Sequence, residues 1–295
     1  MTLPARHFDQ IPFGTFAPNL LGKAGLAFGR ALPAGKAGLK LAGIGRPLAL
    51  AGIKSGVADI EALGLKLRLH PRDNLCEKRL FMTPQCFDPV ELEVLRAAMT
   101  PAAVFLDIGA NAGAYSLVAA KAGGPHARII AVEPQQEMRA RMNYNAQLNG
   151  LHNIETIGAA LSDYEGESVL RMVESNRGRA SLEGEGRESS DAVRVLTLKT
   201  LLEETGLERI DVMKIDVEGG EARILSAFFA EVERPRWPGL IIMERPQVNA
   251  RVITKTGNPA LADENAVALA CRHGYRISQE TRLNAVLIQN PDPAV

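Results

Sequence analysis

A glycine-rich turn at residues 107–115 has the composition of a loop that binds a ligand. The turn reads DIGANAGAY, follows a short apolar run and precedes a helical pattern. In a doubly wound sheet, ligands bind at such turns between a strand and a helix. Glycine lets the backbone approach a ligand closely because it carries no Cβ. We therefore predict cofactor contacts from Asp107, Gly109, Asn111, Gly113 and Tyr115.

Two further carboxylates follow the next apolar runs. Glu133 ends the run at 128–133, where a carboxylate accepts hydrogen bonds from the two ribose hydroxyls of an adenosine group. Asp163 follows the run at 154–160 and is predicted to accept a hydrogen bond from the adenine amino group. A surface turn is the alternative for this aspartate, because Asp is common in turns.

Spacing and charge favour S-adenosylmethionine over a nicotinamide dinucleotide. The dinucleotide pattern is Gly-x-Gly-x-x-Gly, but here Asn111 takes the place of the middle glycine and Gly113 follows two residues later. Asp107 would repel a diphosphate, whereas its charge suits the amino and sulfonium groups of S-adenosylmethionine. We predict S-adenosylmethionine as the cofactor. An NAD(P)-dependent oxidoreductase is the alternative.

A second polar cluster follows the apolar run at 211–216. Asp216 and Glu218 are two residues apart, so they point the same way in an extended segment. Crowded carboxylates raise one another's pKa toward the range of a general base. We predict Asp216, Glu218 and Glu244 as catalytic residues, and Lys214 and Glu221 as substrate-binding residues.

Two alternatives remain for these carboxylates. Glu218 and Glu221 would also suit the first turn of the following helix, whose dipole favours negative charge. Asp216 with Glu244 could hold Mg²⁺, but the sequence offers no third ligand, so we predict no metal. None of the five histidines follows a predicted strand, which makes a histidine base improbable.

Five segments carry a resemblance to a known family. They are FLDIGANAGAYS (105–116), AVEP (131–134), TLKTLL (197–202), IDVMKIDVEGGE (210–221) and IIME (241–244). Together they resemble the FkbM family of S-adenosylmethionine-dependent methyltransferases. The resemblance implies a class I methyltransferase fold, with seven strands and an antiparallel last pair, and O-methylation of hydroxyls on natural products, sugars or glycolipids. Lys199 departs from the family pattern, which often has Asp there.

The elements that position these residues alternate between strands and helices. Short apolar runs at 104–108, 128–133, 154–160, 211–216 and 240–244 are separated by helical segments, as in a parallel sheet covered on both faces. The runs at 275–279 and 284–289 are too close for a crossover helix and are predicted to form an antiparallel hairpin. The predicted fold is a doubly wound, mostly parallel α/β domain over residues 101–295.

An extra segment interrupts this alternation. Residues 168–173 and 192–196 look like a β pair, and the polar stretch at 174–191 between them shows no pattern of its own. Loops of this length are usually functional or disordered. We expect a loop that closes over the acceptor.

Two segments precede the main domain. Residues 59–100 are predicted to form a small cap, with one or two short strands at 59–70 and a helix at 88–99 that begins at Asp88 and Pro89. Residues 1–58 form a basic, Gly- and Ala-rich arm whose seven basic and one acidic side chains leave a net charge of +6. Asn19 is expected to cap a helix with one apolar face, made of Leu20, Leu21, Ala24, Ala27, Phe28 and Ala31. Such an arm packs on its own domain or a second subunit, or anchors on an anionic membrane.

Composition narrows the class of protein. The 295 residues are 46% hydrophobic and 23% charged, as in a globular protein. The 34 basic and 34 acidic residues cancel, so we predict no nucleic-acid partner. The family resemblance implies a small-molecule or glycan acceptor. Cys76, Cys86 and Cys271 match no metal or redox spacing, which predicts free thiols. No run reaches the roughly 18 apolar residues of a spanning helix and no signal peptide is evident, so we predict a cytoplasmic location, with the arm as a peripheral contact to the inner membrane face.

Overall fold

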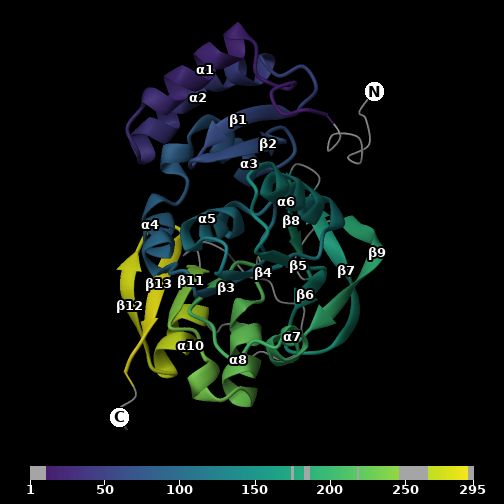
Figure 1. Cartoon of the computed structure of the whole chain (residues 1–295), viewed down its shortest axis with the longest axis vertical. Helices are drawn as coiled ribbons and strands as arrows, with labels where there is room; N and C mark the ends of the chain where they lie inside the picture. The colour runs from purple at the N-terminus through teal and green to yellow at the C-terminus, as the bar shows by residue number, and fades with distance from the viewer. Residues whose placement is uncertain (1–10, 174–175, 183–186, 218, 246–264, 292–295) are drawn as a thin grey trace.

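The computed structural model describes residues 11–173, 176–182, 187–217, 219–245 and 265–291, and these residues form three sheets (Figure 1). The largest sheet has seven strands in the order β12-β13-β11-β10-β3-β4-β5. Its strands are β3 (Val104–Ile108), β4 (Arg128–Val132), β5 (Ile154–Ile157), β10 (Val212–Ile215), β11 (Leu240–Glu244), β12 (Tyr275–Glu280) and β13 (Asn284–Gln289). The first five are parallel, and β13 runs antiparallel to both β11 and β12, which confirms the predicted sheet and hairpin.

Helices cover both faces of this sheet, as its continuous apolar strands require. Phe105 and Ile129 pack on the face covered by α4 (Pro89–Ala98), α5 (Ala114–Gly123) and α6 (Gln136–Leu148) (Figure 1). The next residue on each strand, Leu106 and Ile130, packs on the opposite face, under α7 (Leu198–Thr205), α8 (Glu221–Glu231) and α10 (Ala266–Arg272). Strand order reverses between β3 and β10, which is the point where such sheets bind ligands.

A separate four-stranded sheet stands beside β5. Its order is β6-β9-β7-β8, with β6 (Ala159–Leu161), β7 (Gly166–Val173), β8 (Asn176–Ser181) and β9 (Arg187–Leu196). The predicted strand at 154–160 is thus split, because β5 pairs with β4 while β6 pairs with β9. The predicted pairing of 168–173 with 192–196 is confirmed as part of the antiparallel ladder between β7 and β9.

The expectation of a loop at 174–191 is wrong for most of that stretch. β8 and the first half of β9 occupy it, and β8 pairs with β7 through Arg171 with Ser181 and Met172 with Ala180. These strands are defined by backbone pairing, while their polar sequence lacks the alternation from which a strand is recognised. Residues 174–175 and 183–186 of the expected loop lie outside the described residues.

The predicted cap is present before the main sheet. β1 (Ala58–Ala62) and β2 (Leu65–Leu69) form an antiparallel pair, followed by α3 (Leu75–Met82) and the short 3₁₀ helix η2 (Pro84–Cys86). Asp88 precedes α4 as expected, but it has a left-handed conformation with φ of 40° and its side chain does not cap the helix. All three cysteines are free.

The described part of the N-terminal segment, which begins at residue 11, forms two helices. α1 (Leu20–Ala31) begins after Asn19, whose Oδ1 accepts the Gly22 N–H at 3.0 Å, as predicted. α2 (Lys36–Ala51) was not expected, because three glycines and Pro47 lower the helix propensity of its sequence. Among the described residues, no helix has the length and hydropathy needed to cross a bilayer.

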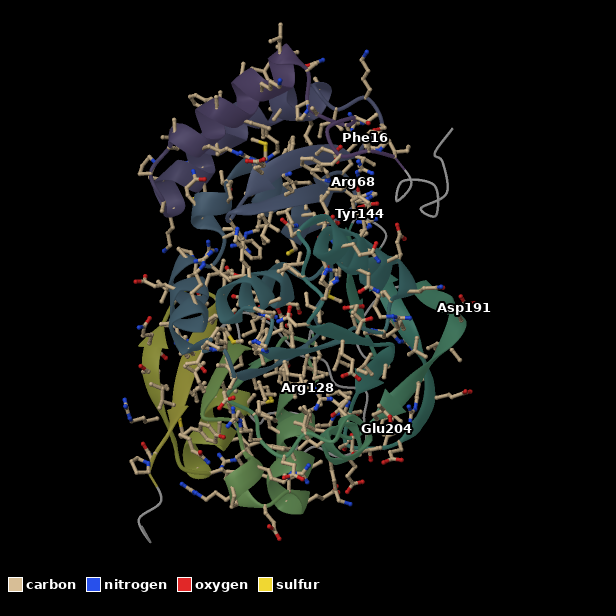
Figure 2. The ribbon with its side chains drawn as sticks, viewed as in Figure 1. Phe16, Arg68, Arg128, Tyr144, Asp191 and Glu204 are labelled. Carbon is tan, nitrogen blue, oxygen red and sulfur yellow. The ribbon has the colours of Figure 1, made fainter. Side chains whose placement is uncertain are left out.

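A buried ion pair ties this segment to the cap. Arg68 Nε donates to Asp59 Oδ1 at 2.7 Å, and its Nη1 donates to the carbonyl of Ile11 at 2.9 Å. Figure 2 shows Phe16 and Tyr144 beside Arg68, with ring centroids 4.8 and 4.7 Å from the guanidinium carbon. Residues 11–58 therefore belong to the fold and are not a loosely attached arm.

Candidate active site

Close approach explains the glycines of the turn between β3 and α5. Gly109 has φ of +77°, and a Cβ there would lie 1.9 Å from the carbonyl oxygen of Asp216. Gly113 has φ of +83°, and its Cβ would lie 2.4 Å from Met142 Cγ. Asn111 also has positive φ, at 53°. Any other residue at the two glycine positions would push the turn away from β10 or α6.

Strand register sets five residues in one row along the edge of the sheet. Val132, Ile108, Ile215 and Met243 are register partners on β4, β3, β10 and β11. The next residues along these four strands are, in the same order, Glu133, Gly109, Asp216 and Glu244. Asn284, the partner of Glu244 on β13, extends the row to five. All five line one cavity of about 300 Å³, a volume at the lower end of the range for ligand sites.

Glu133 has the geometry of a diol-binding carboxylate. The backbone N–H of Asn111 donates to its Oε2 and that of Gln135 to its Oε1, both at 2.9 Å. Burial raises the pKa of Glu133 to about 7, although these two hydrogen bonds oppose the rise. A carboxylate oxygen has two lone pairs, so each oxygen can still accept a ribose hydroxyl. The residue fits the ribose of S-adenosylmethionine.

Asp107 supplies a buried negative group to the same cavity. Ser116 Oγ donates to its Oδ2 at 2.6 Å. Its Oδ1 is buried and has no hydrogen-bond partner among the described residues. Burial raises the pKa of Asp107, while the Lys214 ammonium and the Ser116 hydroxyl act against the rise. An unsatisfied carboxylate oxygen in the cavity wall fits a cationic ligand such as S-adenosylmethionine.

Lys214 is a fixed cation behind the row. It is the register partner of Asp107, and its Nζ lies 3.0 Å from Asp216 Oδ2 and 5.0 Å from the centroid of the Tyr115 ring. Burial by itself lowers the pKa of Lys214, but the attraction of Asp216 and Asp107 outweighs burial and the net shift is upward. Lys214 therefore holds its proton and cannot act as a base near neutral pH.

Residues of the cap complete the cavity, although no motif marks them in the sequence. Arg79 Nη2 donates to Asp88 Oδ1 at 3.2 Å, and the Tyr115 hydroxyl donates to Asp88 Oδ2 at 3.1 Å. Burial raises the pKa of Tyr115, so it stays a neutral donor. Asp88 was interpreted only as a helix start. Its left-handed backbone, which is strained for a residue other than glycine, marks it as part of a site.

Most of the predicted site residues line the cavity. They are Asp107, Gly109, Asn111, Tyr115, Glu133, Lys214, Asp216 and Glu244. Gly113 packs behind the turn instead. Asp163 is exposed and accepts a hydrogen bond from Ser162 Oγ at 3.0 Å, and it is Ser162 that lines the cavity.

Two of the predicted site residues remain, Glu221 and Glu218. Glu221 is not in the cavity lining, and its Oε1 accepts the N–H groups of Val217 at 2.9 Å and Gly219 at 3.4 Å. These two contacts stabilise the turn before α8, so Glu221 has the contacts expected of a helix-capping residue, which was the alternative to substrate binding. Glu218 lies outside the described residues. Within the described ranges, no group of three or more His, Cys, Asp or Glu side chains is arranged to hold a metal ion.

The strand order, the glycine turn and the carboxylate after β4 define a class I, S-adenosylmethionine-dependent methyltransferase. The methyltransferase FkbM domain matches residues 107–277, more than half of the chain. The chain belongs to the FkbM family of methyltransferases, which confirms the resemblance and sets aside the oxidoreductase alternative.

Two relatives match this chain, and one of them is named a methyltransferase. Methyltransferase sdnD of Sordaria araneosa is 27% identical over 235 residues, which cover 69% of this chain and 82% of that protein. AMB antimetabolite synthetase AmbE of Pseudomonas aeruginosa is 30% identical over 164 residues, or 43% of this chain. The aligned stretch spans only 8% of AmbE.

Solved structures are similar at low sequence identity. A putative O-methyltransferase from Klebsiella pneumoniae is 14% identical, with 68% of this chain and 80% of that chain covered and a TM-score of 0.40. TYW2 of M. jannaschii in complex with AdoMet is 12% identical, with 80% and 88% covered and a TM-score of 0.42. At these scores the assignment of the fold rests on the strand order described above.

Proposed function

We propose that this methyltransferase transfers its methyl group to a hydroxyl of a small molecule or glycan. The observation that carries the proposal is the pair of carboxylates at neighbouring strand ends, Asp216 on β10 and Glu244 on β11, facing the cavity beside a fixed cation. A hydroxyl must lose its proton during methylation, and carboxylates are the bases available in this row.

The row also separates a cofactor end from an acceptor end. Neighbouring strands are about 4.8 Å apart, so the backbone after β4 lies about 10 Å from that after β10. Glu133 would hold the ribose of S-adenosylmethionine, which would supply an activated methyl group within the cavity. Glu244 and Asn284 continue the row beyond Asp216 and are placed to contact the acceptor.

Each side chain at the acceptor end has a distinct role in this proposal. Asp216, whose side chain is 39% exposed, accepts the hydrogen bond of the acceptor hydroxyl and takes its proton. Lys214 fixes the direction of the Asp216 carboxylate through their 3.0 Å contact. Glu244 binds a second hydroxyl. Glu218 stays a predicted base that lies outside the described residues.

The proposal is tested by the identity of the methylated atom. The purified full chain would be incubated with S-adenosylmethionine carrying a ¹³C-methyl group and a panel of sugars and polyols, each matched with its amino analogue. We expect an O-methyl signal by NMR, and a turnover that falls by about 10²-fold or more in Asp216→Asn, because a general base typically contributes 10²–10⁴ in rate.

A carboxylate outside the cavity serves as the matched control for Asp216→Asn. Glu203 is an exposed carboxylate on α7, paired with Lys199 at 3.4 Å, so Glu203→Gln should leave turnover unchanged. Methylation only at nitrogen, or full turnover in Asp216→Asn, would contradict the proposed acceptor and base.

A further inference from the structure

The pair formed by α1 and α2 has mostly small residues inside, with the buried Leu26 as the large exception on α1, and most of its large apolar residues outside. On α1, Gly22, Gly25 and Gly29 are buried, whereas Leu20 is 86% exposed and Phe28 is 44% exposed. The apolar face predicted for this helix is therefore the face that the rest of the chain does not cover. In helices of water-soluble domains the apolar stripe normally faces the core.

Backbone contact between the two helices explains the inversion. A Cβ at Gly25 would lie 2.5 Å from the backbone nitrogen of Ala49, and a Cβ at Gly52 would lie 2.2 Å from Gly22 Cα. Larger side chains cannot occupy this interface. Close packing through small residues is typical of helix pairs in lipid, where large apolar residues gain nothing by leaving the surface.

The second helix repeats the arrangement. Gly38, Ala42, Gly45 and Ala49 are buried, whereas Leu41, Ile44 and Leu48 are exposed, Ile44 by 68%. Of the ten large hydrophobic residues that are exposed in the described part of the chain, six lie between residues 20 and 48. Exposed apolar surface is thus concentrated on this helical hairpin, which we define as residues 20–51.

The charged side chains of the hairpin and its flanks are all basic. Residues 11–58 contain six basic side chains and no acidic one. Arg30 turns inward and donates to the carbonyls of Glu61 and Phe81. The other five are exposed, namely Lys23, Lys36, Lys40, Arg46 and Lys54. A purely basic surface around exposed apolar residues complements an anionic bilayer, and each basic residue near such a surface adds to the binding.

We propose that the helical hairpin docks the protein on the surface of an anionic phospholipid bilayer, with Leu20, Phe28 and Ile44 among the side chains that enter its interfacial layer. The hairpin lies at the end of the molecule away from α8 and α10, so nothing of the main sheet obstructs a flat surface there (Figure 1). This inference does not depend on the acceptor proposed above.

Docking would also place one wall of the cavity near the bilayer. Gln85 Nε2, in η2, donates to the carbonyls of Gly29 and Leu32 on the hairpin side, at 2.9 and 3.1 Å. The preceding helix α3 supplies Leu75, Cys76 and Arg79 to the cavity lining. A rigid connection through α3 and η2 thus joins the hairpin to the cavity.

The test is flotation of the full chain with vesicles of phosphatidylcholine alone or mixed with phosphatidylglycerol. We expect binding to the mixed vesicles that weakens with salt. Two double variants, Leu20→Gln with Ile44→Gln and Lys36→Glu with Lys40→Glu, should each lower the bound fraction about tenfold or more. The changed side chains are exposed, so circular dichroism should show an unchanged fold.

Matched controls lie on the main domain. Ile277 is 41% exposed on β12 and Lys199 is exposed on α7, so Ile277→Gln and Lys199→Glu should bind vesicles as the unchanged chain does. The proposal is overturned by absence of binding to the mixed vesicles, or by equal binding of the hairpin variants and the controls. A lipid-free dimer that the Leu20→Gln, Ile44→Gln variant dissociates would identify a second copy as the occupant and overturn it as well.

Discussion

Replacing Glu133 by glutamine should change both cofactor affinity and its dependence on pH. The carboxylate form is needed to accept two ribose hydroxyls while it also accepts the N–H groups of Asn111 and Gln135. A glutamine has one oxygen, so its amide nitrogen must face one of these donors. Hydrogen bonds to a charged group contribute about 1.5–3 kcal/mol. We therefore expect Glu133→Gln to weaken S-adenosylmethionine binding roughly 10- to 150-fold.

The pH dependence follows from the burial of this carboxyl group. Its pKa rises from 4.5 to about 7, which corresponds to about 3 kcal/mol at about 1.4 kcal/mol per pH unit. Below pH 7 the folded chain holds a proton on Glu133 that must leave before a diol can bind. Affinity for S-adenosylmethionine should therefore fall as the pH drops below 7 in the unchanged chain, by up to tenfold per pH unit, and should be nearly flat in Glu133→Gln.

The free energy of unfolding has the opposite trend. Because the pKa is higher in the folded chain, the proton on Glu133 stabilises the fold fully below about pH 4.5, and this contribution is lost as the pH rises through 7. The slope between these pH values should be smaller in Glu133→Gln. Calorimetric titration with S-adenosylmethionine and urea unfolding, each between pH 5 and 8.5, measure the two effects. Equal affinities and equal slopes in both chains would refute the role of Glu133.

Three further predictions concern the turn, the fixed cation and the buried ion pair. Gly109→Ala should abolish cofactor binding measured by calorimetry, because its Cβ would lie 1.9 Å from the Asp216 carbonyl oxygen. Lys214→Met should still fold but should lower kcat by about tenfold or more, because the Asp216 carboxylate loses its 3.0 Å partner. The rate is measured by the release of S-adenosylhomocysteine, and an unchanged kcat would contradict a role for Lys214 in orienting Asp216. Arg68→Met should lower the free energy of unfolding by about 3–5 kcal/mol, because it leaves the buried Asp59 carboxylate without its cationic partner, with only the N–H groups of Gly14 and Phe16 as donors. The exposed pair of Arg194 and Glu204 is its control, since Arg194→Met should leave the free energy of unfolding nearly unchanged in the same urea titration.

The main sheet was predictable because its strands are buried on both faces. Runs such as 104–108 and 240–244 are apolar apart from Asp107 and Glu244, and the structure places β3 and β11 at the same residues. The register between strands could not be read from the sequence. The register sets Glu133, Asp216 and Glu244 in one row. In the sequence, only their positions at the ends of predicted strands suggested that they lie together.

The site was predictable where one short segment carries it. The glycine turn lies within nine consecutive residues, so its spacing alone indicates a ligand loop. Asp88 and Asn284 are 196 residues apart and meet at the cavity only through the fold, so no local pattern connects them. Glu221 shows a second reason why part of the site could not be predicted from the sequence. A carboxylate in the first turn of a helix is expected for capping and for substrate binding alike, and only its contacts with Val217 and Gly219 distinguish the two.

The N-terminal hairpin shows why composition can mislead about helices. Glycine lowers the propensity of α2, which is why this helix was not expected. The same glycines let α1 and α2 approach to backbone contact, and that packing supplies the stability that each helix lacks by itself. Amphipathic spacing correctly placed Leu20 and Phe28 on one face of α1. It could not say what covers that face, because a periodic pattern is the same whether the apolar stripe meets a protein core or a bilayer. The close packing of the glycines fills most of the inner side and leaves Leu20 and Phe28 exposed in the described chain, and this exposure is the observation behind the proposed docking on a bilayer.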